Sequence, residues 1–263
     1  MPARQAPATR SPELDRGHVV MDLSTVGLAI AGLFLAGIVK GGTGLGFSSC
    51  ALPFLVPAVG LPTAMSLIIA PALATNIGVA LRAGHIRETS QQFWMFYVAT
   101  MPGIAIGMSL LLAVDKDLAV NLLGLVVISY TAIAMVQPDF RLAPGVARQL
   151  QAPLGFANGI IAGFTGSQVV PLLPYMMSLG LESGRMVQAI NLSVILSSLG
   201  VAVALAISNM MSEVLLDLSL LAILPAILGV KLGSYWRERI SVKRFRLIVL
   251  AVLYFIGVSL LAH

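Results

Sequence analysis

Three apolar runs limit what this chain can fold into more than any other feature of its sequence. They cover residues 94–114, 118–136 and 214–230, and each contains at most one charged residue. The hydrocarbon core of a bilayer is about 30 Å thick, so a helix of about 17–25 apolar residues crosses it. A helix also satisfies its own backbone hydrogen bonds in lipid. We therefore predict an all-α integral membrane protein.

The composition supports this class and excludes several others. Of the 263 residues, 58% are hydrophobic and 10% are charged, whereas a soluble domain carries about 25% charged residues. The net charge of +5 comes from basic residues at the ends of the apolar runs, which is a topology signal and not a nucleic-acid surface. Cys50 is the only cysteine and the three histidines lie far apart. No disulfide, metal site or cofactor is predicted.

The chain is duplicated. Residues 34–44 and residues 156–166 match at six of eleven positions without a gap. The correspondence continues from Pro53 to Pro174 with a spacing near 120 residues. Internal repeats of this kind define the fold. We predict four parts, which are a disordered polar tail over 1–21, a first transmembrane repeat over 22–137, a cytoplasmic linker over 138–150 and a second transmembrane repeat over 151–263.

Each repeat has the same order of predicted pieces. A short apolar helix (about 22–39, then 151–162) is followed by a Gly-Thr-Gly break and a second short segment (about 45–59, then 167–179). Three ordinary spans complete each repeat, and they cover about 62–82, 92–113 and 118–137, then 184–207, 214–233 and 245–261. The prediction is about 8–10 membrane segments, with short discontinuous helices that meet near the midplane. Whether the short segments span or re-enter stays open.

The bias of basic residues predicts opposite orientations for the two repeats. Lysine and arginine favour cytoplasmic loops, which places 82–87, the linker and 237–246 inside. The connections 115–117 and 208–213 are acidic or neutral and are expected outside. Matching loops then lie on opposite sides, as in an inverted-topology repeat.

The two glycine breaks are the predicted substrate site. Inverted-repeat transporters bind substrate at broken helices whose N-termini point at anionic groups, and glycine lets an anion approach the backbone N–H groups. The alternative is that these glycines only allow close helix packing. The first break and the polar residue after it supply Gly41, Gly42, Thr43, Gly44 and Ser48, and the second supplies Thr165, Gly166, Ser167 and Gln168.

Lys40 stands beside the first break and has two interpretations. A lysine deep in a membrane is costly and usually functional, but a long side chain can also reach back to the interface. The matching residue in the second repeat is Ala162. Asn76 and Asn191 interrupt later spans, and they either bond across helices or line the site. All three are candidate substrate-binding residues.

Several function classes find no support in the sequence. No carboxylate lies within 23–87 or within the predicted spans 92–113 and 184–207, so proton coupling through an embedded acid is not predicted. No P-loop and no cluster of catalytic residues is present. The chain is therefore not predicted to be an enzyme.

The glycine motifs resemble those of the sulfite exporter TauE/SafE family, also called the toluenesulfonate uptake permease family. The resemblance covers about residues 25–261 and depends on 37–44 before Pro53 and on 159–166 before Pro174. It implies transport of sulfite, thiosulfate, sulfonates or other small organic acids. Phe164 interrupts the second motif, which leaves the substrate and the direction of transport open.

We therefore expect a secondary transporter that moves a small anion by alternating access. An anion channel is the nearest alternative, and a membrane-embedded enzyme or assembly factor is a more distant one. The expected partners are the small anion and the lipid bilayer, with no nucleic acid, and a homo-oligomer is compatible with the sequence. The expected location is the cell (inner) membrane, as a multi-pass protein.

Overall fold

The computed structural model describes residues 23–44, 46–136 and 141–239, together with 250–251, 254–255, 257–258 and 260–261. Every regular element within these residues is helical, which confirms the predicted all-α class. The predicted tail over 1–21 lies outside the described residues. The helices are α1 (Leu23–Thr43), α2 (Phe47–Val59), α3 (Leu61–Ala83), α4 (Ile86–Ala113), α5 (Lys116–Val136), α6 (Pro144–Thr165), α7 (Leu172–Ser178), α8 (Ser183–Ile207), α9 (Glu213–Leu221) and α10 (Ile223–Arg239).

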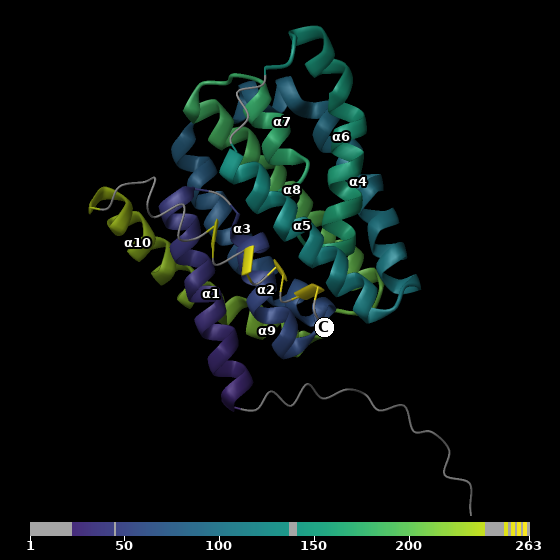
Figure 1. Cartoon of the computed structure of the whole chain (residues 1–263), viewed down its shortest axis with the longest axis vertical. Coiled ribbons are helices and arrows are strands. Elements are labelled where there is room, and N and C mark those ends of the chain that lie inside the picture. Colours follow the sequence, from purple (N-terminus) through teal and green to yellow (C-terminus); the bar gives the residue numbers. More distant parts are fainter. Residues whose placement is uncertain are drawn as a thin grey trace, which may run out of the picture.

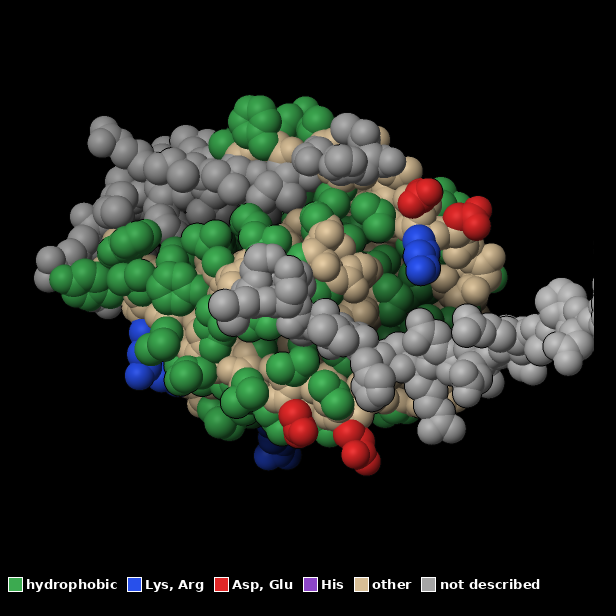
Figure 2. Space-filling view, turned by 90° about the horizontal axis from the view of Figure 1, so that it is seen from below, with side chains coloured by type: hydrophobic (Ala, Val, Ile, Leu, Met, Phe, Trp, Pro, Cys, Tyr) green, Lys and Arg blue, Asp and Glu red, His purple; other side chains and the backbone are tan. Residues whose placement is uncertain are grey.

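The outer surface fits a lipid environment. Five stretches of helix in the described part are long and apolar enough to cross a membrane, namely Leu61–Ala83, Ile86–Ala113, Lys116–Ile133, Ser183–Ile207 and Glu213–Trp236. Large hydrophobic side chains such as Ile207 and Leu221 are exposed on them. Figure 2 shows hydrophobic side chains over much of the described surface, with charged side chains in a few small groups.

The helices that follow the two glycine breaks are too short to cross the bilayer core. α2 has 13 residues and α7 has 7, which correspond to about 20 Å and 10 Å at 1.5 Å per residue. A β-carbon added at Gly32 of α1 would lie 2.8 Å from Cβ of Phe54 in α2. The later part of α2 therefore returns along the earlier part of α1, so α1 and α2 form a hairpin. α2 ends where Gly60 adopts a φ of 77°.

Close helix pairs join the two repeats in a reciprocal way. α1 of the first repeat packs along α10 of the second, and α6 of the second packs along α4 of the first (Figure 1). Glycines lie at the closest approach of the helices in both pairs. A β-carbon on any of these glycines would strike backbone atoms of the neighbouring helix, as expected where small residues let membrane helices approach. The glycines are Gly37, Gly41, Gly229 and Gly233 in one pair and Gly103, Gly107, Gly155, Gly159 and Gly163 in the other.

The glycine contacts also define helix directions. Gly37 faces Ala226 and Gly41 faces Val230 and Ser234, so α1 and α10 run the same way. The same reasoning applies to α4 and α6, because Gly103 and Gly107 face successively later residues of α6. α2 returns along α1, α3 repeats the direction of α1, and α4 returns again, so α6 runs opposite to α1. This arrangement fits the predicted inversion, while the membrane side of each loop stays a prediction.

Three predicted boundaries need correction. α6 begins at Pro144 and not near residue 151, so it contains most of the predicted linker. α1 continues through Gly41 to Thr43. The segment predicted over 167–179 is helical only from Leu172 to Ser178, because Pro171 lacks an N–H group and restricts the residue before it. The predicted span 214–233 lies within the membrane-crossing stretch Glu213–Trp236, in which Ala222 separates α9 from α10.

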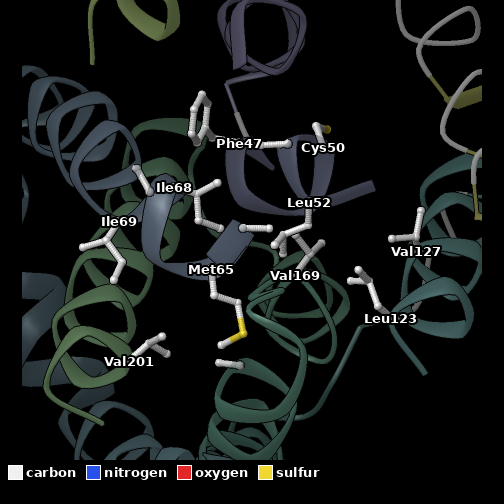
Figure 3. Close-up of a cluster of buried hydrophobic side chains, with 14 of the residues drawn as sticks. Phe47, Cys50, Leu52, Met65, Ile68, Ile69, Leu123, Val127, Val169 and Val201 are labelled. Carbon is white, nitrogen blue, oxygen red and sulfur yellow. The ribbon is translucent and has the colours of Figure 1, made fainter. Parts of the chain in front are cut away.

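The core lies where the two repeats meet. Leu52 of α2, Met65 of α3 and Val169 after α6 are buried and converge there (Figure 3). A β-carbon at Gly166 would lie 2.7 Å from Met65 Cγ. The short helix α2 is therefore held between α3 and the second break, and this places both breaks at the centre of the protein.

Candidate functional site

The two glycine breaks contact each other through their side chains. In the first, Gly44 and Gly46 have φ values of 80° and 79°, a region that glycine adopts without strain. In the second, Gly166 has a φ of 72°. The Ser49 and Ser167 hydroxyl oxygens lie 2.7 Å apart, so one hydroxyl donates to the other. Residues that are more than one hundred positions apart thus share one hydrogen bond.

Lys40 lies inside the protein beside these breaks. Its side chain is buried, with an exposed fraction of 2%. Its ammonium donates to Asn76 Oδ1 of α3 over 2.6 Å and to Asn191 Oδ1 of α8 over 3.4 Å. Of the two placements that the sequence left open, the structure has the buried one. Lys40 therefore connects α1 with one helix from each repeat.

The two asparagines are fixed so that their oxygens point to Lys40. Asn76 donates its Nδ2 to the carbonyl oxygen of Ala72 over 2.6 Å. Asn191 does the same to the carbonyl oxygen of Val187 over 2.8 Å. Each amide is thus held by the preceding turn of its own helix. The carbonyl ends remain available for the ammonium group.

No carboxylate balances this charge in the part of the chain that the structure describes. The acidic side chain with an ion pair there is Glu88, which contacts His85 and Arg185, and Lys40 is bonded to amide oxygens alone. Burying a charge without a counter-ion costs several kcal/mol, and intramembrane charges are usually kept for function. An anion beside Lys40 would supply the missing negative charge.

A small cavity lies next to this cluster. It measures about 20 Å³, enough for about one water molecule. Polar groups from both repeats line it, namely Ser48, Ser49, Asn76 and Gln168. The Ser48 hydroxyl and the Gln168 Oε1 atom are buried and have no hydrogen-bond partner. The cavity thus offers unused hydrogen-bonding groups beside a positive charge.

The other predicted site residues take different positions. Gly41 lies inside α1 against α10, and its carbonyl oxygen accepts a bond from Ser234 at 3.3 Å, so helix packing explains it. Gly42 is a buried residue of α1, and the side chain of Thr43 lies outside the described part of the chain. Thr165 donates to the carbonyl oxygen of Ile161 and accepts from the Ser167 N–H at 3.1 Å, which shapes the second break.

Ser198 belongs to the cluster but was not predicted from the sequence. Its hydroxyl accepts a hydrogen bond from Gln168 Nε2 over 3.2 Å, which orients the Gln168 side chain. Ser198 follows Asn191 by seven residues, two helical turns that return to the same face. That spacing was the available signal. The described residues contain no group of three or more His, Cys, Asp or Glu side chains that could hold a metal.

The fold is that of a polytopic α-helical membrane protein. The sequence matches the sulfite exporter TauE/SafE family over residues 28–260, and the chain belongs to this family, whose members are membrane permeases for sulfite and related anions. No curated protein and no solved structure shows significant similarity to the chain. The match covers nearly everything except the polar tail.

Proposed function

We propose that this protein is a secondary transporter of a small anion, a sulfur oxyanion, an organosulfonate or a small organic acid, in the cell (inner) membrane. The observation that carries the proposal is the buried Lys40 ammonium, which has amide oxygens as its hydrogen-bond partners. An anion that enters the neighbouring cavity gains a charge-assisted interaction with Lys40. It also gains bonds from the Ser48 hydroxyl and from the polar groups at the two breaks.

The proposed mechanism is alternating access around this cluster. The central cavity is smaller than an oxyanion, so the site must widen for binding. Lys40 contacts Asn76 and Asn191 on two different helices. A bound anion would compete for the ammonium and weaken one or both contacts. Binding would therefore be coupled to movement between α3 and α8, which is how a ligand shifts a conformational equilibrium.

Replacement of Lys40 tests the role of the charge. In purified protein, Lys40→Gln should raise the dissociation constant for sulfite or thiosulfate by about 10- to 100-fold, the range for a hydrogen bond to a charged group. Lys40→Arg should have a smaller effect, because it keeps the charge. Lys231→Gln is the matched control, since Lys231 is exposed on α10 and should bind like the parent. Binding by Lys40→Gln within twofold of the parent would exclude Lys40 from the site.

The concentration dependence of sulfite uptake distinguishes a transporter from an anion channel. In proteoliposomes, a transporter gives sulfite uptake that saturates and that accelerates when sulfite is also present inside. A channel gives a flux that follows the electrochemical gradient without such exchange. Uptake that stays linear with concentration and unaffected by internal sulfite would favour the channel.

A further inference from the structure

A line of buried polar side chains runs along one face of α6. Gln151, Asn158 and Thr165 are spaced seven residues apart, which is two turns of a helix, so they share one face. All three are buried, with exposed fractions of 6%, 0% and 2%. Asn158 has no hydrogen-bond partner for either its oxygen or its nitrogen, and Gln151 Oε1 has none either. We call these three residues the α6 polar line.

One end of the α6 polar line opens into a wide pocket. This vestibule has a volume of about 460 Å³ and is lined by Gln151 together with Gln92, Arg148 and Tyr175. Arg148 is the one charged residue among the described residues that line it. The Arg141 guanidinium lies beside Gly180, next to Leu179 of the vestibule wall. The vestibule is therefore positively charged, and it lies on the side predicted to be cytoplasmic.

The other end of the line reaches the central cluster. Thr165 accepts the Ser167 N–H, and the neighbouring Gln168 lines the central cavity. Gln188 of α8 is completely buried and also has both ends of its amide unpartnered. It precedes Ala189, whose carbonyl oxygen accepts the Tyr97 hydroxyl of α4. The residue before Tyr97, Phe96, faces Gly155 of α6. Gln188 therefore lies at about the level of Gly155, between Gln151 and Asn158 of the α6 polar line.

Buried amides without partners are rare, because desolvation makes them costly. In α1, the residues matching Gln151 and Asn158 are Ala29 and Ala36, and both are also buried. Alanine thus satisfies the packing requirement at these positions. Packing alone does not explain why Asn158 is an amide with both ends unpartnered. Gln151 donates its Nε2 to the carbonyl oxygen of Gln92 over 2.9 Å, and its Oε1 has no partner. A solute that hydrogen-bonds to the free groups would account for both residues.

We propose that the α6 polar line is the route by which the anion passes between the vestibule at Arg148 and the central cluster at Lys40. The proposal rests on the proposed anion transport and adds its path. Amide N–H groups replace water around the anion in successive steps, first at Gln151, whose Nε2 uses one of its two hydrogens on the carbonyl oxygen of Gln92, and then at Asn158, whose Nδ2 has no partner. α1 has no such path, so access from the opposite side follows different elements.

An aromatic pair lies against α6 at the vestibule. Tyr175 of α7 lines the vestibule and stacks on Phe96 of α4, with ring centroids 5.7 Å apart and an angle of 2° between the rings. The Tyr175 hydroxyl donates to the carbonyl oxygen of Ala147 over 2.9 Å, which holds the ring against α6. Phe96 faces Gly155, and Asn158, about one turn further along α6, is fully buried. On the proposed route, an anion reaches Asn158 only after Tyr175 moves away from Phe96.

Thiol labelling tests the route independently of transport. The chain has one cysteine, Cys50, which is buried, so a Cys50→Ser background carries single replacements Gln151→Cys and Asn158→Cys. The controls are Ala29→Cys and Ala36→Cys at the matching positions of α1. In proteoliposomes, anionic 2-sulfonatoethyl methanethiosulfonate should label the two α6 cysteines from one side, about 10-fold faster than the cationic trimethylammonium reagent, because positive charge focuses anions. The α1 controls should not be labelled from that side.

Two further measurements sharpen the outcome. Tyr175→Ala should speed labelling of the Asn158→Cys protein about 10-fold, and Tyr175→Phe, which keeps the ring, should not. If Asn158→Cys does not reach the membrane, sulfite uptake by Asn158→Leu replaces it, with Ala157→Leu as the control on another face of α6. A 10-fold loss confined to Asn158→Leu supports the route.

Different results overturn the route and the transport function. An unreactive Asn158→Cys in protein that carries sulfite overturns the route and leaves the function intact. Equal labelling of Ala36→Cys and Asn158→Cys from the same side also overturns it. Labelling of Asn158→Cys in protein that carries neither sulfite nor thiosulfate overturns the proposed substrates and supports the path.

Discussion

The first helices of the two repeats, α1 and α6, share one packing surface and differ in chemistry. Both carry glycines at matching positions, Gly37 and Gly41 in α1 and Gly159 and Gly163 in α6, and both use them against a helix of the other repeat. Lys40 of α1 corresponds to Ala162, and the two amides of the α6 polar line correspond to alanines. Duplication has therefore kept the backbone contacts, while of these two helices α1 carries the buried charge and α6 the buried neutral amides.

The largest expected effect comes from breaking the shared packing. Gly37→Leu and Gly159→Leu should each remove most of the folded protein from the membrane, because a β-carbon at either site collides with backbone that cannot move aside. Fluorescence-detected size exclusion measures the folded fraction. The control is Gly27→Leu, since a β-carbon there meets nothing within 4 Å. If only one of the two variants fails, the contacts are not equivalent.

The next largest effect is expected when the buried lysine is moved from the first repeat to the second. The double variant Lys40→Ala with Ala162→Lys should carry sulfite at least about 10-fold more slowly than the parent, a loss typical of a missing charged hydrogen bond. Asn76 and Asn191 direct their oxygens to the side chain of α1, so a lysine on α6 does not reach them. Uptake is compared at equal amounts of folded protein. Restored uptake would show that the repeats are interchangeable.

Two of the positive-φ glycines, Gly44 and Gly166, should differ by a smaller amount when each is replaced by alanine. An alanine costs about 1–2 kcal/mol in this backbone region at either position. Gly44 has open space around its missing β-carbon, whereas Gly166 is packed against Met65 and Leu52. Gly166→Ala should therefore be about 1–3 kcal/mol less stable than Gly44→Ala, the usual cost of overpacking. Thermal unfolding in detergent measures the difference, and equal stabilities would contradict the tighter packing of the second break.

The smallest effect concerns the bond between the repeats. Ser49→Ala and Ser167→Ala should each lower the free energy of unfolding by about 1 kcal/mol, the net value of one hydrogen bond. Because the two hydroxyls bond to each other, the double variant should be less harmful than the sum of the two. A double-mutant cycle measures this coupling. A coupling energy near zero would mean that the two breaks are held by other contacts.

The sequence alone determined the all-α membrane class of the protein and most of the polar residues that cluster around Lys40. Long apolar runs predict membrane-spanning helices, because a helix satisfies its own backbone hydrogen bonds in lipid. The repeated glycine motif reveals the duplication whether or not its residues are buried. The polar residues that interrupt apolar sequence lie close together in the structure, namely Lys40, Ser48, Asn76, Ser167, Gln168 and Asn191, with Ser167 joined to the cavity through Ser49. These signals are local, because composition and spacing carry them without any knowledge of neighbours.

Only the tertiary structure decided what each residue contacts. The depth of Lys40 depends on where α1 lies relative to α3 and α8, and no local pattern contains that distance. Gly41 and Gly44 read alike in the sequence, yet the first packs on α10 and the second faces open space. The difference between Asn158 and Ala36 likewise gained meaning when both proved to be buried at matching positions. Side-chain roles in a membrane protein depend on which helix lies opposite, and long-range packing sets that choice.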